Sequence, residues 1–168
     1  MKKLYLIRHA KSLKDGITPD FVRPLTKRGK NDAKAMALKL KNLNHKPDLI
    51  ISSSAKRTSK TAKIIARYLE YKGTIKYTKK LYSCEIDAYM NEIYAIKDKY
   101  KSVFIVGHND ELSELCEYLS GLSLEPLPTC GIYALKFKLK KFSKIKPNSA
   151  KIMFFERPKI FKAILNKF

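Results

Sequence analysis

Apolar runs that end in polar residues constrain the fold of this chain more than any other feature. The run Leu4–Ile7 is followed at once by Arg8 and His9. Two further apolar runs, at 49–51 and 103–106, also lead into polar segments. Such runs are typical of strands buried in a parallel sheet, and ligands of these sheets bind in the crevice beyond the strand ends. We therefore expect an α/β fold with a polar site where three strand ends meet.

Two arginines and two histidines are expected at this site. Arg57 follows the second run, and His108 follows the third. Guanidinium groups bind a tetrahedral phosphoryl group through their fork of N–H donors and neutralise charge on its oxygens. A neutral imidazole can attack phosphorus directly, and nearby arginine charges favour that neutral form by lowering the histidine pKa. The combination indicates a site that binds and transfers phosphate.

Metal ions and other cofactors are not required by this chemistry, because the arginines can stabilise the charge on the phosphoryl oxygens. The sequence carries no aspartate-rich metal motif. Its cysteines, Cys84, Cys116 and Cys130, are odd in number and lack a Cys-x-x-Cys spacing. This usage indicates a reducing compartment without a zinc site or a disulfide framework.

Strand-like and helix-like segments alternate along the chain. Helical periodicity follows Thr26 to about residue 43 and recurs over 58–69, 86–94 and 112–119, while strands are expected at 49–52, 74–77, 103–107, 131–140 and 151–156. The segment 131–140 alternates apolar and basic residues in its second half, which predicts a strand exposed on one face. The order predicts a single domain over residues 1–168, a three-layer α/β/α sandwich with a mostly parallel central sheet.

The chain is strongly basic, with a net charge of +21 that is spread over nearly its whole length. We interpret most of this charge as lysine on solvent-facing positions, and we expect neither a nucleic acid nor a membrane as partner. No signal peptide or membrane span is recognisable, so the expected compartment is the cytoplasm. Residues 160–168 form an amphipathic basic segment, which we expect to pack as a terminal helix against the sheet.

Several motifs, in the same order, resemble those of the histidine phosphatase superfamily, the phosphoglycerate-mutase-like enzymes. They are Arg8-His9-Ala10, the segment 52–62 with Arg57, Val106-Gly107-His108-Asn109, and the segment 127–131. The segment 22–29, which contains Arg23, and the short chain resemble the SixA branch of phosphohistidine phosphatases. Ala10 stands where the family usually has glycine, and Ser54 stands where many members have proline.

The resemblance implies a role for each matching residue. His9 would be the residue that is phosphorylated during turnover. The side chains around the phosphate would be those of Arg8, Arg57 and His108, and Arg23 would be a further phosphate ligand. Larger members of the family also carry an acid that protonates the leaving group, and no motif fixes one in this chain. Glu85, Asp87 and Asp15 are the candidates, and each can equally be a solvated loop residue.

The resemblance implies a metal-independent phosphatase that removes phosphate from phosphohistidine on a phosphotransfer protein. A short enzyme without a dedicated acid suits a P–N bond, because imidazole leaves readily once it is protonated, whereas an alkoxide does not. A small phosphate ester is the alternative substrate. A non-catalytic module that binds anions or nucleic acid is a third hypothesis. The sequence leaves the physiological substrate and the oligomeric state open.

Overall fold

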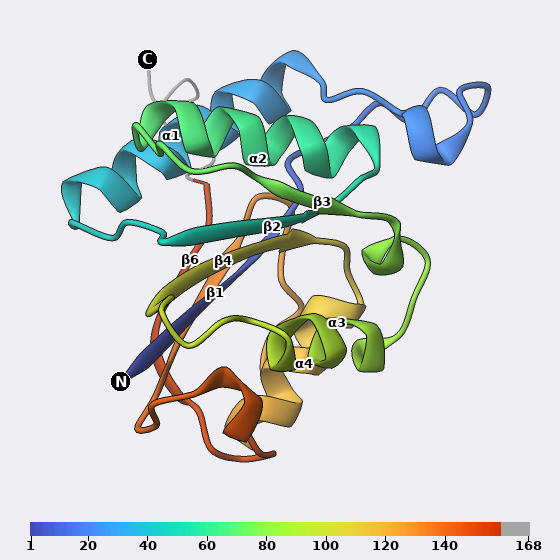
Figure 1. Ribbon diagram of the computed structural model, residues 1–168. Helices are drawn as coiled ribbons and strands as arrows, with labels where there is room; N and C mark the ends of the chain where they lie inside the picture. Colours follow the sequence, from blue (N-terminus) through green and yellow to red (C-terminus); the bar gives the residue numbers. More distant parts are fainter. Residues whose placement is uncertain (159–168) are drawn as a thin grey trace, which may run out of the picture.

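A six-stranded sheet forms the centre of the computed structural model, which describes residues 1–158 (Figure 1). The strands are β1 (Lys2–Arg8), β2 (Leu49–Ser53), β3 (Lys76–Thr78), β4 (Ser102–Gly107), β5 (Ile132–Phe137) and β6 (Lys151–Glu156). Their order across the sheet is β3-β2-β4-β1-β5-β6. The first four strands are parallel, whereas β5 runs antiparallel to both of its neighbours.

Helices cover both faces of the sheet, so the molecule has three layers (Figure 1). The helices are α1 (Lys27–Asn42), α2 (Lys56–Tyr68), α3 (Ile86–Tyr94) and α4 (Glu111–Ser120), with short 3₁₀ turns η1 (Asp20–Val22), η2 (Lys79–Leu81) and η3 (Phe142–Lys144). Helices α1 and α2 lie side by side on one face, and α3 and α4 lie on the other. The expected α/β/α sandwich with its mostly parallel sheet is confirmed.

Strand β1 shows why the sheet needs two helical layers. Leu4 and Leu6 point into the core beneath α3 and α4, whereas Tyr5 and Ile7 point into the core beneath α1 and α2. All four side chains are at most 1% exposed. Because successive side chains of a strand alternate between faces, only a strand covered on both sides can have four apolar residues in a row.

Strand β5 corrects one expectation. The alternating sequence at 131–140 predicted a strand exposed on one face, but β5 is shorter and is buried except for the half-buried Lys136. The prediction was wrong because β5 lies inside the sheet, between β1 and β6, with core side chains on both faces. The expected terminal helix at 160–168 lies outside the described residues. Within residues 1–158, no helix is long and apolar enough to cross a membrane.

The register of the sheet brings the polar strand ends together. Arg8, the last residue of β1, pairs with Gly107, the last residue of β4, so His9 and His108 leave the sheet at the same level. On the other side of β4, Ser52 of β2 pairs with Val106, and the chain then turns into α2. The three strand ends therefore open at one edge of the sheet, on the right in Figure 1.

Candidate functional site

All five residues predicted from the sequence line one cavity of about 330 Å³ at this edge. They are Arg8, His9, Arg23, Arg57 and His108. They come from four parts of the fold, with Arg8 and His9 adjacent at the end of β1. His9 follows β1, His108 follows β4, Arg57 lies in the first turn of α2, and Arg23 follows η1. The sequence therefore predicted correctly which side chains meet, and their chemical roles remain proposals.

His9 is held in a single tautomer. Its ring is 7% exposed, and its Nδ1 lies 2.8 Å from the carbonyl oxygen of Ala10. Because a carbonyl oxygen only accepts, Nδ1 must donate, which leaves the lone pair on Nε2. The pKa of His9 is lowered to about 3, mainly by burial and also by the charges of Arg57, His108 and Arg8, while the hydrogen bond to Ala10 acts in the opposite direction. The imidazole is therefore neutral at physiological pH, the state that a nucleophile requires.

The main chain beside His9 is fixed by the helix on that side of the sheet. The amide of Ala10 donates to the Thr61 hydroxyl at 3.0 Å, and this hydroxyl donates to the carbonyl oxygen of Arg57 at 2.8 Å. Thr61 thus connects the end of β1 to the first turn of α2. Since Ala10 and Thr61 are buried, the separation between His9 and Arg57 is set by packed structure and not by a mobile loop.

His108 is also held in one tautomer. Arg57 Nη2 lies 3.3 Å from His108 Nδ1, and a guanidinium only donates, so Nδ1 is the acceptor. The opposite nitrogen, Nε2, then carries the proton and donates to the Ser53 hydroxyl at 2.8 Å. Burial, together with the Arg57 charge, lowers the pKa of His108 to about 4. The two histidine rings face the same space, with centroids 5.6 Å apart.

Tyr89 of α3 fixes the backbone of His108. Its hydroxyl accepts a hydrogen bond from the His108 amide at 3.1 Å, and its ring is fully buried. Gly107 permits this approach, because a Cβ at that position would lie 2.2 Å from the tyrosine hydroxyl. The glycine that closes the third apolar run is therefore required by close packing beside the site.

Arg8 and Arg57 each retain a buried N–H group without an acceptor. Arg8 Nη1 donates to the carbonyl oxygen of Leu127 at 2.9 Å, and Arg57 Nη1 donates to that of Asp20 at 2.7 Å. Within the described part of the chain, neither Nε has a hydrogen-bond partner. A buried donor without an acceptor is unfavourable, and an anion in the cavity is the type of group that would satisfy it.

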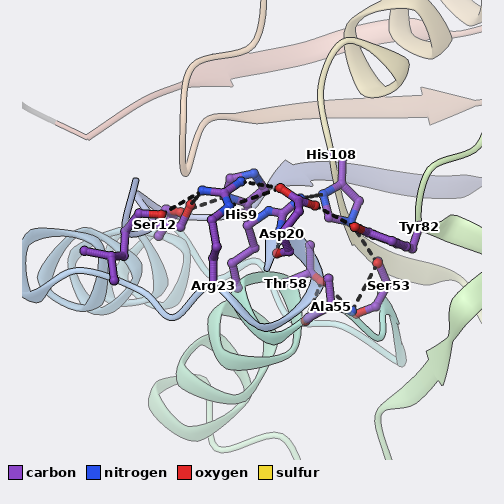
Figure 2. Close-up of polar contacts among 12 residues, drawn as sticks. His9, Ser12, Asp20, Arg23, Ser53, Ala55, Thr58, Tyr82 and His108 are labelled. Atoms are coloured by element: carbon purple, nitrogen blue, oxygen red, sulfur yellow. Dashed lines mark hydrogen bonds and ion pairs between the residues drawn. The ribbon is translucent and has the colours of Figure 1, made fainter. Parts of the chain in front are cut away.

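Asp20 joins two of the predicted phosphate ligands (Figure 2). One of its carboxylate oxygens accepts from Arg23 Nε and Nη2 at 3.1 and 2.9 Å. The other accepts from Arg57 Nη2 at 3.1 Å and from the Tyr82 hydroxyl at 2.6 Å. The Tyr82 hydrogen bond contributes most to lowering the pKa of Asp20 well below its usual range, followed by Arg23 and Arg57. Asp20 is therefore an anion at the centre of a basic cavity.

Among the other residues that line this cavity, sequence reasoning missed the acidic and phenolic side chains Asp20, Tyr82 and Glu111. Asp20 precedes Arg23 by one 3₁₀ turn, so an ion pair at that spacing was the available signal. Tyr82 and Glu111 gave no local signal, because they reach the cavity through the packing of η2 and α4. The Oε2 atom of Glu111 is buried, with no hydrogen-bond partner among the described residues.

The three acids considered as proton donors are not among the residues that line the cavity. Asp15 instead shapes the loop after β1, where its carboxylate accepts from the amides of Ile17 and Thr18 and from the Thr18 hydroxyl. These hydrogen bonds, that of the Thr18 hydroxyl foremost, lower its pKa to about 2. Glu85 and Asp87 are exposed at the start of α3. Among residues 1–158, no cluster of three or more His, Cys, Asp or Glu side chains has an arrangement that could hold a metal ion.

Comparisons with known proteins agree with this geometry. Residues 4–94 match the model of a family described as the histidine phosphatase superfamily (branch 1). The chain is 32% identical over 145 residues to an uncharacterized chloroplastic protein of Arabidopsis thaliana, across 80% of this chain and 66% of that one. It is 38% identical over 68 residues to a mitochondrial serine/threonine-protein phosphatase of Xenopus laevis, across 40% of this chain and 24% of that one.

The fold superposes on solved structures over nearly its whole length. One is a protein of Agrobacterium tumefaciens assigned as the phosphohistidine phosphatase SixA, with a TM-score of 0.81 and 27% identity. The match covers 94% of this chain and 98% of that chain. By contrast, the chain spans somewhat less than two thirds of the Arabidopsis relative and about a quarter of the Xenopus relative.

Proposed function

Because the chain belongs to the histidine phosphatase superfamily, we propose that it is a phosphatase that transfers the phosphoryl group of its substrate to His9 and then to water. The observation that carries this proposal is the tautomer of His9, whose Nδ1 donates to the Ala10 carbonyl oxygen and leaves Nε2 with a free lone pair. A histidine in this state, in a cavity lined by three arginines, is suited to attack phosphorus.

The reaction has two steps. In the first, Nε2 of His9 forms a bond to phosphorus while the bond between phosphorus and the leaving group breaks. With phosphohistidine as substrate, the leaving group takes the electron pair and, with a proton that solvent has placed on its other ring nitrogen, departs as neutral imidazole. In the second, water attacks the phosphorus of phospho-His9, the P–N bond breaks, and neutral His9 and inorganic phosphate are formed. Arg8 and Arg57 bind the phosphoryl oxygens in both steps, Arg23 adds a ligand at the mouth of the cavity, and His108 lies beside the phosphoryl group, where its ring accepts from Arg57.

The proposed substrate is phosphohistidine on a protein. Imidazole is a good leaving group once protonated, so its departure depends less on a strong general acid than that of an alcohol. Asp20 supports this choice, because it is paired with two arginines and is deprotonated. It therefore holds no proton that it could donate to an alcohol leaving group. The structural similarity to the Agrobacterium SixA protein supports the same substrate class.

A small phosphate ester is the second candidate substrate. Glu111 favours it, because one of its carboxylate oxygens is buried without a partner in the described part of the chain and could carry the proton that an alcohol needs. The similarity to the Xenopus serine/threonine-protein phosphatase supports an ester bond, although on a protein and not on a small molecule. On this alternative, the phosphoryl transfer through His9 is unchanged and only the leaving group differs.

Phosphate release from two substrates tests the proposal. Wild type and the His9→Ala variant are given a histidine-phosphorylated phosphotransfer domain and, separately, para-nitrophenyl phosphate, without added metal. We expect wild type to have a higher kcat/KM for the phosphorylated domain and His9→Ala to release phosphate from neither. A higher kcat/KM for the ester would establish the second candidate instead. Activity retained by His9→Ala would contradict both.

A further inference from the structure

A second concave surface lies beside the catalytic cavity, on the helical layer formed by α1 and α2. Its volume is about 380 Å³, and Lys30 of α1 and Lys56, Lys60 and Lys63 of α2 line it. We call this surface the lysine groove. All four side chains are exposed, and Leu25 and Ser59 contribute to the wall between the two helices.

The sequence of α2 concentrates positive charge on the groove. Residues 56, 60 and 63 follow the spacing that places side chains on one face of a helix. The helix carries five basic residues and no acidic residue. Among residues 1–158, none of the ion pairs includes a lysine of the groove, although other lysines of the chain are paired. Like charges at this spacing repel one another, so a bound anion would relieve the repulsion.

The lysine groove adjoins the catalytic cavity. Arg23 and Arg57 line the catalytic cavity, whereas their chain neighbours Pro24 and Lys56 line the groove. Two short backbone segments thus form a shared wall between the two concave surfaces. A macromolecule that places a phosphorylated side chain in the catalytic cavity would therefore have its neighbouring surface over the groove.

We propose that the lysine groove docks an acidic segment of the protein that carries the phosphoryl group to be removed. This inference rests on the proposed function and specifies what surrounds the reacting side chain on the substrate. Lysine ammonium groups bind carboxylates as flexible point charges, whereas the planar forks of arginine, which suit phosphate, line the catalytic cavity. The two surfaces thus differ in the anion that they suit.

The composition of the groove favours a protein over a nucleic acid. Proteins that bind single-stranded nucleic acids combine basic residues with aromatic side chains on which bases stack. The side chains that line the groove include no aromatic residue. Docking by lysines alone adds long-range attraction to an acidic surface, and this attraction weakens as salt increases.

Charge reversal separates docking from catalysis. The variant Lys30→Glu/Lys60→Glu/Lys63→Glu leaves Lys56 in place because it adjoins Arg57. The control variant Lys97→Glu/Lys99→Glu/Lys101→Glu changes the charge equally, at exposed positions just before β4 at the opposite edge of the sheet. For a histidine-phosphorylated phosphotransfer domain with an acidic surface, we expect the groove variant to raise KM by about tenfold at unchanged kcat. We expect kcat/KM for para-nitrophenyl phosphate to stay within about twofold in both variants.

Direct binding tests the groove independently of turnover. A fluorescein-labelled glutamate-rich peptide should bind wild type and the control variant, and binding should be lost in the groove variant. If wild type fails to dephosphorylate the domain but the peptide binds in this pattern, the proposed substrate is wrong, and the binding of acidic segments by the groove is still supported. Equal KM values or equal peptide binding for the groove and control variants would contradict the proposal that the groove docks an acidic segment. If a single-stranded oligonucleotide bound more strongly than the peptide, and only with the groove intact, the partner of the groove would be a nucleic acid and the proposal of an acidic protein would be wrong.

Discussion

The guanidinium of Arg57 donates to the carboxylate of Asp20 at 3.1 Å, and the same carboxylate accepts from Arg23. Figure 2 shows Asp20 lying between Arg23 on one side and His108 and Tyr82 on the other. A phosphoryl group needs the donors that Asp20 occupies, because both are anions with oxygens that accept from guanidinium groups. In the proposed mechanism, the aspartate therefore competes with the phosphate for the arginines of the site.

Replacement of Asp20 should tighten phosphate binding. Asp20→Asn removes the charge and keeps the shape, so we expect inorganic phosphate to inhibit the variant about tenfold more strongly than wild type. Asp15→Asn is the matched control, because Asp15 lies in the same loop but does not line the cavity. Inhibition constants measured with para-nitrophenyl phosphate give the comparison. Weaker inhibition of Asp20→Asn would show instead that the aspartate holds the arginines in place for the phosphate.

Arg23 should contribute through its fork geometry as well as its charge. It donates to Asp20, to the Ser12 hydroxyl and to the Leu13 carbonyl oxygen, which fixes the plane of the guanidinium. Arg23→Lys keeps the charge but loses the paired donors, and we expect it to raise KM by about tenfold with little change in stability. Arg28→Lys, on the exposed side of α1, should leave KM unchanged. If both variants matched wild type, Arg23 would not be a phosphate ligand.

Tyr89 should act as a positioning residue. In Tyr89→Phe the buried amide of His108 loses its acceptor, so we expect the free energy of unfolding to fall by about 1–2 kcal/mol. We also expect kcat to fall more than KM rises, because the His108 ring would no longer be held against Arg57. Tyr94→Phe, on the exposed side of the same helix, is the control for chemical denaturation and kinetics. A purely structural role would lower stability in Tyr89→Phe and leave kcat as in wild type.

Acid should destabilise the folded protein through its two buried histidines. The folded-state pKa values of His9 and His108 lie at about 3 and 4, below the usual histidine value of 6.5. Below pH 6.5 the unfolded chain therefore binds protons that the folded chain does not, and stability falls as the pH decreases towards 4. Each histidine should contribute about 2 kcal/mol to the loss in unfolding free energy between pH 7 and pH 5.

Urea unfolding of wild type and His9→Gln at these two pH values measures that contribution. The loss of stability between pH 7 and pH 5 should be smaller in the variant, because one of the two protonation differences is absent. Equal losses in the two proteins would mean that His9 has an ordinary pKa in the folded state. Such a result would also remove the electrostatic reason for a neutral nucleophile at acidic pH.

The strands that form the centre of the site could be predicted because their signal is local. β1 and β4 are buried on both faces, and such strands appear in the sequence as unbroken apolar runs. The residue after each run then falls at the carboxyl edge of the sheet, whatever the rest of the fold does. For this reason His9, His108 and Arg57 could be expected in one cavity.

The features that sequence reasoning missed depend on tertiary neighbours. The lysines that alternate over 136–140 predicted an exposed face, but only Lys136 lies in β5, and β6 and the helical layers cover that strand. Tyr82 reaches Asp20 across 62 residues of sequence, and nothing in its own segment indicates the contact. Glu111 resembles any acidic residue in the first turn of a helix until the position of α4 beside the cavity is known.

The central claim is that His9 carries the phosphoryl group during turnover. Phosphohistidine hydrolyses in acid but is stable in base, so wild type mixed with phosphorylated substrate is quenched in base and digested. Mass spectrometry then shows whether the peptide that contains His9 carries a phosphoryl group. The account predicts one added phosphoryl group on His9 in wild type and none in His9→Ala. Turnover by wild type with no label on His9, or with the label on another residue, would contradict it.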